Sequence, residues 1–278
     1  MDWLTEPFQF EFMRQALVIA LVIAVPAALF SCLLVVKSWS LMGDAISHAV
    51  LPGIVIAYVL KIPLIIGAFA AGMLCAVATG YFSINSRLKE DTVMGVVFSG
   101  MFALGVVLFQ QIHTGIHLEH VLFGNILGVS WTDILQTAAI AAVVVCVLLV
   151  RMKDIKLYAF DLQHAGVIGI NATALHYLLL AMLSLVIVAS IKAVGIILVI
   201  AILIAPGSVA FILTRRFESM LWIAVAVAMI CSVFGVFFSY HLNSAPAPTI
   251  VVLMTLLFIV VFLFAPGRGV LHQRKTVS

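Results

Sequence analysis

The sequence has little charge: Asp, Glu, Lys and Arg make up 9% of its 278 residues, whereas about a quarter of a soluble domain is charged. Its hydrophobic share is 65% and its mean hydropathy is +1.31. This composition excludes water as the solvent of the folded chain. The net charge of +3 comes from basic residues spread over short loops, a pattern that gives no basis for a nucleic-acid partner.

Motifs for catalysis and redox chemistry are also missing. The four cysteines lie inside apolar runs at wide spacing, which disfavours a disulfide framework and a cysteine metal cluster. The chain contains no G-x-x-x-x-G-K-[ST] loop, so it binds no nucleotide through a Walker motif. It contains no H-E-x-x-H zinc-protease motif either. A hydrolytic enzyme is therefore disfavoured.

Apolar runs long enough to cross a bilayer recur along the chain. A hydrocarbon core of about 30 Å needs about 20 apolar residues per helix. Prolines and glycines inside some runs can break helices, so eight spans with re-entrant pieces are an alternative to nine. We predict an all-α, polytopic integral membrane protein with about 8–9 transmembrane helices in a single transmembrane domain over residues 1–278. The nine candidate spans lie near residues 15–36, 41–60, 63–82, 92–111, 132–150, 172–191, 194–213, 220–240 and 249–266.

The basic residues predict how the chain is oriented in the membrane. With the basic C-terminal tail placed inside, eleven of the fourteen Lys and Arg residues fall on the inner side. Because cytoplasmic loops carry an excess of Lys and Arg, we expect the N-terminus outside and the C-terminus inside. Two connections exceed hairpin length: an extracytoplasmic loop over residues 112–131 and a cytoplasmic segment over residues 151–171.

Two polar residues interrupt the second predicted span. Asp44 and His48 are four residues apart, a spacing that places both side chains on one face of a helix. A charged side chain at the centre of a span costs about 2.5–3.5 kcal/mol on insertion scales, so its presence is a functional-site hypothesis. A carboxylate oxygen and an imidazole nitrogen together suit Mn²⁺, Fe²⁺ or Zn²⁺. We interpret the pair as two metal ligands, which a second copy of the helix across a two-fold axis would raise to four.

Interpretations without a bound metal compete with this one. An Asp–His hydrogen bond, a proton relay, or a position of Asp44 near the membrane interface each explain the same spacing. In the outer loop, His113, His117 and His120 are candidates for transient metal capture. A solvated loop is the simpler explanation of these three histidines.

The residues around Asp44 and His48 resemble a known family. Residues 42–53 read MGDAISHAVLPG, which is similar to the G-D-x-x-S-H-x-x-x-P-G signature of the permeases of zinc, manganese and iron ABC importers. Residues 122–127, LFGNIL, resemble the L-F-G-x-I-L of that family. Residues 243–250, NSAPAPTI, lack the acidic residue and Gly-Ala pair of many members, and this form is closest to the manganese/iron (chelated-iron) branch.

A third match lies in the cytoplasmic segment. Phe160, Asp161, Ala165 and Gly169 fit the F-D-x-x-x-A-x-x-x-G stretch that, in the family, docks on the ATPase. A fourth match runs from residue 194 to residue 206. The resemblance therefore covers nearly the whole chain.

The resemblance implies both a function and a set of partners. In the family, the aspartate and histidine that correspond to Asp44 and His48 bind the metal inside the membrane. The implied assembly lies among the lipids of a bacterial inner membrane and contains a second permease subunit, identical or homologous, cytoplasmic ABC ATPase subunits and an extracytoplasmic metal-binding protein. The chain would then be no enzyme and hold no prosthetic group. Its cargo would be a divalent ion, manganese or iron, with zinc as a further candidate.

Two rivals come from other functional classes. A proton-coupled secondary metal transporter would explain Asp44 and His48 equally well, but it leaves the long cytoplasmic segment unexplained. A membrane enzyme that uses the outer histidines would need a nucleophile or a complete metal triad at membrane depth, and the sequence offers neither.

Overall fold

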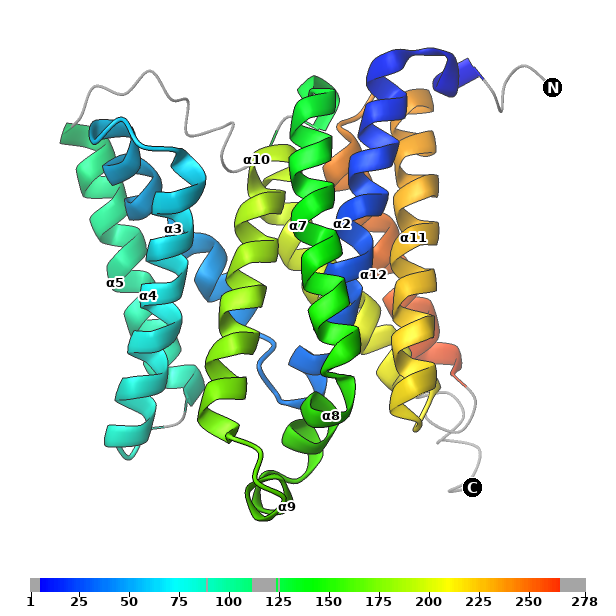
Figure 1. Cartoon of the computed structure of the whole chain (residues 1–278). Helices are drawn as coiled ribbons and strands as arrows, with labels where there is room; N and C mark the ends of the chain where they lie inside the picture. The colour runs from blue at the N-terminus through cyan, green and yellow to red at the C-terminus, as the bar shows by residue number, and fades with distance from the viewer. Residues whose placement is uncertain (1–5, 89, 112–123, 125, 266–278) are drawn as a thin grey trace.

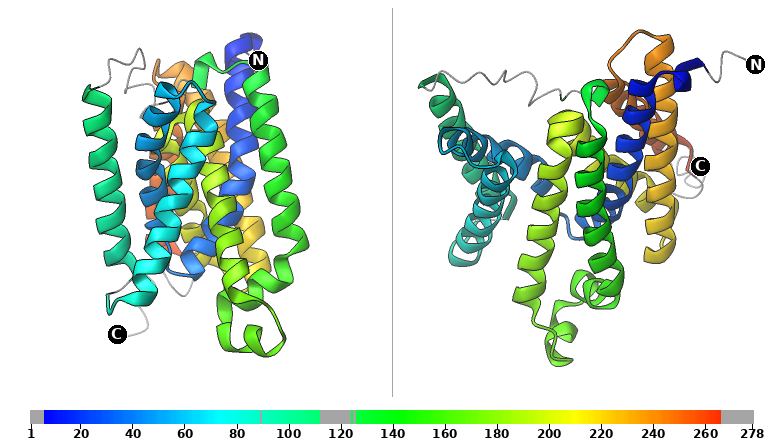
Figure 2. Two further views of the ribbon diagram at one scale, coloured as in Figure 1. Left: turned by 60° about the vertical axis from the view of Figure 1, so that its left-hand side comes forward. Right: turned by 45° about the horizontal axis from the view of Figure 1, so that its top comes forward.

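The structure, a computed structural model, describes residues 6–88, 90–111, 124 and 126–265 (Figures 1 and 2). Within these ranges the chain forms helices and no strand, which confirms the all-α prediction. In chain order the elements are η1 (Glu6–Gln9), α2 (Glu11–Val36), α3 (Met42–Val59), α4 (Leu64–Asn85), α5 (Glu90–Gln111), η2 (Ile126–Gly128), α7 (Trp131–Val150), α8 (Met152–Phe160), α9 (Leu162–Val167), α10 (Ala172–Leu213), α11 (Phe217–His241) and α12 (Pro246–Phe264).

Nine helical segments of the described chain are long and apolar enough to cross a membrane, and their bounds lie within a few residues of the predicted spans. This confirms the polytopic prediction. Two of the nine, Ala172–Ile191 and Ala193–Leu213, lie within α10, which consists of two helical parts on either side of a non-helical residue, Gly195. Pro52 and Pro206 lie inside helices that continue past them, so neither proline divides a span into re-entrant pieces.

Helix α10 is interrupted at a glycine instead. Gly195 has φ 77° and ψ 167°, a backbone conformation that is essentially restricted to glycine. Gly124 packs against the backbone of Val194 and Gly195, where an added Cβ would overlap it. Farther along α10, the N–H of Gly207 donates a hydrogen bond of 2.8 Å to Ser31 Oγ of α2. A neighbouring side chain thus satisfies a backbone group beside Pro206, as lipid surroundings require.

The helices fall into two groups that meet at α10. Helix α2 packs against α7, α10 and α11, and α12 packs against α10 and α11. Helices α3, α4 and α5 pack on one another and lie together on the left of Figure 1, where α3 and α4 also contact α10. The short helices α8 and α9 lie at the bottom end of the bundle, away from the start of α2 (Figure 1). The buried core is formed by α2 and α10, with side chains such as Ile19, Ile23, Phe30, Leu180 and Ile187.

Helix α3 packs closely against α4 and α5 at glycine positions. At Gly53 an added Cβ would overlap the carbonyl oxygen of Gly67 on α4. At Gly105 of α5 an added Cβ would lie 2.8 Å from the ring of Pro52. Small residues let helix backbones come close in a membrane, where van der Waals packing drives association. These contacts hold α3 between α4 and α5.

Gly53→Ala is therefore expected to destabilise the protein, because the new methyl group displaces the α4 backbone. Overpacking of this kind costs about 1–3 kcal/mol. The matched control is Gly95→Ala, whose Cβ has no heavy atom within 4 Å. In detergent, the apparent unfolding temperature should fall for the first variant, and for the second it should stay unchanged or rise slightly, because alanine favours a helix over glycine. Equal unfolding temperatures would contradict the described α3–α4 contact.

Candidate metal-transport site

Asp44 and His48 lie on one face of α3, with Asp44 in the first turn. His48 Nε2 is 3.3 Å from Asp44 Oδ1. Two ligand atoms that are each about 2.1 Å from one ion lie about 3.0–3.4 Å apart at octahedral to tetrahedral angles. The two side chains thus have the spacing of neighbouring ligands of a single ion.

The imidazole of His48 is enclosed by aromatic rings from α5. Its centroid is 6.2 Å from that of Phe98, in a stacked arrangement, and 5.2 Å from that of Phe102, edge to face. The second ring nitrogen, Nδ1, is buried and has no hydrogen-bond partner within the described residues. An unpaired buried polar atom costs about 1–3 kcal/mol, and such groups need an explanation beyond stability.

The Asp44–His48 pair is open on one side. The side chain of His48 is 27% exposed and that of Asp44 is 33% exposed in the single chain. Among the described residues no group of three or more His, Cys, Asp or Glu side chains could hold a metal. The pair offers two potential donor atoms, and a metal ion held here would need further donors from outside this set.

The sequence-predicted coupling residues are held together in a compact turn. Asp161 Oδ1 accepts a 2.8 Å hydrogen bond from the His164 N–H and so caps α9. Ala165 is fully buried, and its carbonyl accepts a 3.0 Å hydrogen bond from the Ile170 N–H. Gly169, with φ 86°, makes the reversal that ends the helix. Each residue has a local structural role that depends on its type.

Three large apolar side chains of this segment are exposed, beside charged and polar ones. Phe160, Val167 and Ile168 are 61%, 84% and 59% exposed. Phe160 also packs edge to face on Phe217 at the start of α11, with 5.6 Å between the ring centroids. Phe160, Val167 and Ile168 lie outside the nine candidate spans, where exposed apolar side chains can contact a protein partner.

Two groups of residues differ between the sequence predictions and the described site. His113, His117 and His120 lie outside the described residues, so their suggested role stays a prediction. Phe98 and Phe102 were not singled out by the sequence reasoning. Their four-residue spacing inside an apolar run placed them on one helix face, but that spacing carries no information about which helix they meet.

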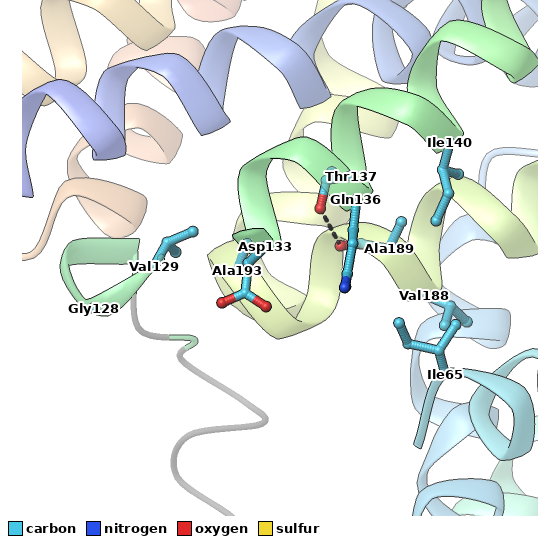
Figure 3. Close-up of a pocket in the computed structure, with 10 residues that line it drawn as sticks. All are labelled: Ile65, Gly128, Val129, Asp133, Gln136, Thr137, Ile140, Val188, Ala189 and Ala193. Carbon is cyan, nitrogen blue, oxygen red and sulfur yellow. Dashed lines mark hydrogen bonds between the residues drawn. The ribbon is translucent and has the colours of Figure 1, made fainter. Parts of the chain in front are cut away.

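A cavity of about 100 Å³ lies apart from the Asp44–His48 pair, beside the interruption of α10 (Figure 3). Asp133 and Gln136 of α7 contribute polar groups to it, and Thr137 Oγ1 donates to the carbonyl of Ala189 at 3.5 Å. The Asp133 carboxylate accepts a 2.7 Å hydrogen bond from Ser130 Oγ within the α7 cap. With one carboxylate that already forms part of a helix cap, the cavity is a weaker candidate for metal binding than the α3 pair.

Comparison with known proteins decides the family. A model of the ABC 3 transport family matches residues 9–265. The chain belongs to the ABC 3 transport family. Curated relatives of this ABC 3 chain include the chelated iron transport system membrane protein YfeD of Yersinia pestis, 55% identical over 94% of this chain and 88% of the relative. The manganese transport system membrane protein MntB of a Synechocystis strain is 46% identical over 98% of this chain and 89% of the relative.

A solved structure shares the fold as well. It is described as PsaBC from Streptococcus pneumoniae in complex with Fab, and it is 34% identical in sequence. The TM-score is 0.87, and the match covers 98% of this chain and 99% of that one. The resemblance to metal-importer permeases, made on the motif around Asp44 and His48, is thereby confirmed at the level of the family.

The cap of α9 leads to a local test. Asp161→Ala removes the acceptor for the His164 N–H, whereas Asp161→Asn keeps an equally good capping residue. A lost N-cap costs about 1 kcal/mol, so we expect roughly five-fold faster amide exchange in α9 for Asp161→Ala alone. Hydrogen–deuterium exchange of the detergent-solubilised protein measures this. The same exchange rate in the alanine variant and the parent protein would show that the cap does not hold α9.

Proposed function

We propose that this chain is the membrane-spanning permease subunit of an ATP-driven importer of divalent transition metals. Manganese and iron are the favoured cargo, because its relatives are named as iron and manganese transport proteins and because the 243–250 stretch resembles that branch. Zinc is the further candidate, since a nitrogen and oxygen donor set also accepts it. The observation that carries the proposal is the Asp44–His48 pair on α3, with ligand spacing and one open side.

The transport site would form between two permeases. A single chain offers one carboxylate and one imidazole, and a second identical or homologous subunit would bring the other two donors across a two-fold axis. Four ligands replace the water that a divalent ion loses on entering the membrane. Binding there must be weak enough for release, as conduction demands. Asp44 and His48 would pass the ion onward without any chemical change, so this subunit is no enzyme and holds no prosthetic group.

The segment of α8 and α9, with its exposed apolar side chains, would be the docking surface for a separate cytoplasmic ABC ATPase. Residues 151–171 then form the cytoplasmic coupling segment of a single permease domain over residues 1–278. The opposite end of the bundle, including residues 112–131, would receive an extracytoplasmic metal-binding protein. The distribution of Lys and Arg supports this orientation, with the N-terminus outside and the C-terminus inside a bacterial inner membrane.

A proton-coupled metal transporter is the alternative function, and the energy source separates it from the proposal. Uptake by the ATP-driven importer stops when the partner ATPase is inactivated by mutation. Uptake by a proton-coupled carrier continues under that change and stops with a protonophore. Membership of the ABC 3 transport family favours the first outcome.

Asp44→Asn and His48→Ala are each expected to reduce uptake of radiolabelled manganese or iron to background, because the first removes the carboxylate charge and the second removes the imidazole ligand. Folding should be unharmed, since removal of a carboxylate from a span relieves a cost of up to about 2.5–3.5 kcal/mol. Asp91→Asn, at an exposed carboxylate near the start of α5, is the matched control and should transport normally. Membrane expression is measured in parallel. Parental uptake by either site variant would refute the site.

The orientation has its own test, in a background whose native cysteines, Cys32, Cys75, Cys146 and Cys231, are replaced by alanine. Ser244 and Ser86 are exposed residues in the connections that follow α11 and α4. Ser244→Cys should react with a membrane-impermeant thiol reagent in cells with a permeabilised outer envelope. Ser86→Cys should react only after the inner membrane is opened. The reverse labelling pattern would invert the assigned topology.

A further inference from the structure

Four side chains from three segments meet at the end of the bundle that carries α8; we name Lys37, Trp39, Tyr158 and His176 the cation–aromatic cluster. Tyr158 of α8 shares a 2.9 Å hydrogen bond with His176 Nδ1, near the start of α10. The Lys37 ammonium lies over the Tyr158 ring, 4.2 Å from its centroid, and 5.4 Å from the centroid of Trp39. Trp39 meets His176 edge to face at 5.1 Å.

The cluster is packed and largely withdrawn from solvent. Tyr158 is 5% exposed and Trp39 is 8% exposed. A void of only about 10 Å³ remains beside Lys37, Trp39 and Tyr158. Contacts between a cation and desolvated aromatic faces are stronger than exposed ones. Because little empty space remains, a displacement of Tyr158 requires Trp39 to move as well.

Trp39 is joined to α3 by a tight connection. Ser38 has φ 57°, and the Trp39 N–H donates to the Leu34 carbonyl at 2.7 Å. The Trp39 carbonyl accepts a 2.9 Å hydrogen bond from the Met42 N–H, at the first residue of α3. Asp44 follows in the first turn of that helix. Movement of the Trp39 backbone is thus passed directly to the turn that holds the carboxylate.

We propose that the cation–aromatic cluster is the positioning element through which α8 moves the start of α3, and with it Asp44 and His48. This inference rests on the proposed function, because it assigns the drive to an ATPase docked on α8 and α9. The hydrogen bond between Tyr158 and His176 is the joint that keeps α8 in register with α10 while Lys37 and Trp39 carry the displacement to α3.

A second contact joins α8 to α11 instead of α3. Lys156 Nζ is 3.0 Å from Glu218 Oε1 of α11, but the two side chains are 46% and 79% exposed. Exposed ion pairs are weak and screened by salt. Helix α11 carries neither Asp44 nor His48. Of these two links, the cluster is the one that joins the docking segment to the metal pair.

The test uses the complete importer, with its ATPase and its metal-loaded binding protein, reconstituted in lipid vesicles. Tyr158→Phe removes the hydroxyl and keeps the ring. We expect manganese transported per ATP hydrolysed to fall roughly 2- to 10-fold, the range that corresponds to one net hydrogen bond. The ATPase rate and the manganese affinity of the permease should stay at the parental values. A purely structural defect would instead lower expression, transport and ATP hydrolysis together, and it would leave the amount of manganese transported per ATP hydrolysed unchanged.

Control and rescue variants make the test specific. Tyr177→Phe removes a neighbouring hydroxyl that makes no hydrogen bond within the described chain, although its ring packs on His176 at 5.4 Å. This variant should couple normally. His176→Asn keeps a partner for the Tyr158 hydroxyl and should couple better than His176→Phe. Lys37→Met keeps the apolar stem without the charge, and it supplies an independent measurement if the tyrosine variant folds poorly.

The outcomes separate this inference from the function on which it rests. If the parental complex transports metal and Tyr158→Phe and Lys37→Met both keep the parental transport-to-ATP ratio, the cluster has no coupling role and the inference is overturned. If the parental complex hydrolyses ATP without transporting manganese or iron, the proposed function itself fails. A loss of coupling in Tyr177→Phe equal to that in Tyr158→Phe would also overturn the role given to the Tyr158–His176 hydrogen bond.

Discussion

The close backbone approach of α3 to α4 and α5 is the constraint on which the rest of the candidate site depends. Gly53 and Gly67 meet where neither has room for a side chain, and Pro52 packs beneath Gly105. These contacts lie one turn or more beyond His48 on the same helix. They bring α5 close enough for two of its aromatic rings to enclose the imidazole. The enclosure of His48 by α5 therefore depends on residues that have little side-chain chemistry of their own.

The bilayer imposes a second constraint, because every backbone polar group at membrane depth needs a partner. Helix α10 has two positions at which its regular geometry or its hydrogen bonding is interrupted, Gly195 and Pro206. At Gly195 the chain departs from helical geometry and packs against Gly124. Near Pro206 the helix continues, and the hydroxyl of Ser31 on α2 accepts from the Gly207 N–H. Both contacts join α10 to other parts of the molecule at the points where the helix is interrupted.

Polar side chains are few, and their positions divide the molecule into functional parts. The Asp44–His48 pair lies on α3, and the helix-capping Asp161 lies in the α8–α9 segment at one end of the bundle. Between them the cation–aromatic cluster supplies the contact from α8 to the start of α3. Apolar helices surround these groups and give them a rigid frame. In the proposed function, the pair would serve as a weak ion site and the cluster as its connection to the energy source.

The spans could be predicted from sequence because they depend on local properties. Hydropathy and length are read along one dimension, and each of the nine candidate segments agrees with a helix of the described chain. The facing of Asp44 and His48 followed from the helical repeat alone. Asp161 and Gly169 were predicted only as part of a family motif for ATPase docking, and their roles as a helix cap and a reversal became visible in the structure.

Tertiary structure decided what the apolar helices touch. Phe98 and Phe102 meet His48, and Tyr158 meets His176 and Lys37, through contacts between helices. It also placed the interruption of α10 at Gly195, and it kept Pro52 and Pro206, which could have broken a helix, inside continuing helices. These outcomes could not be predicted because helices that are hydrophobic on all sides show no preferred face in their sequence. Which faces meet depends on shape and close packing, and those become defined only when the whole bundle assembles.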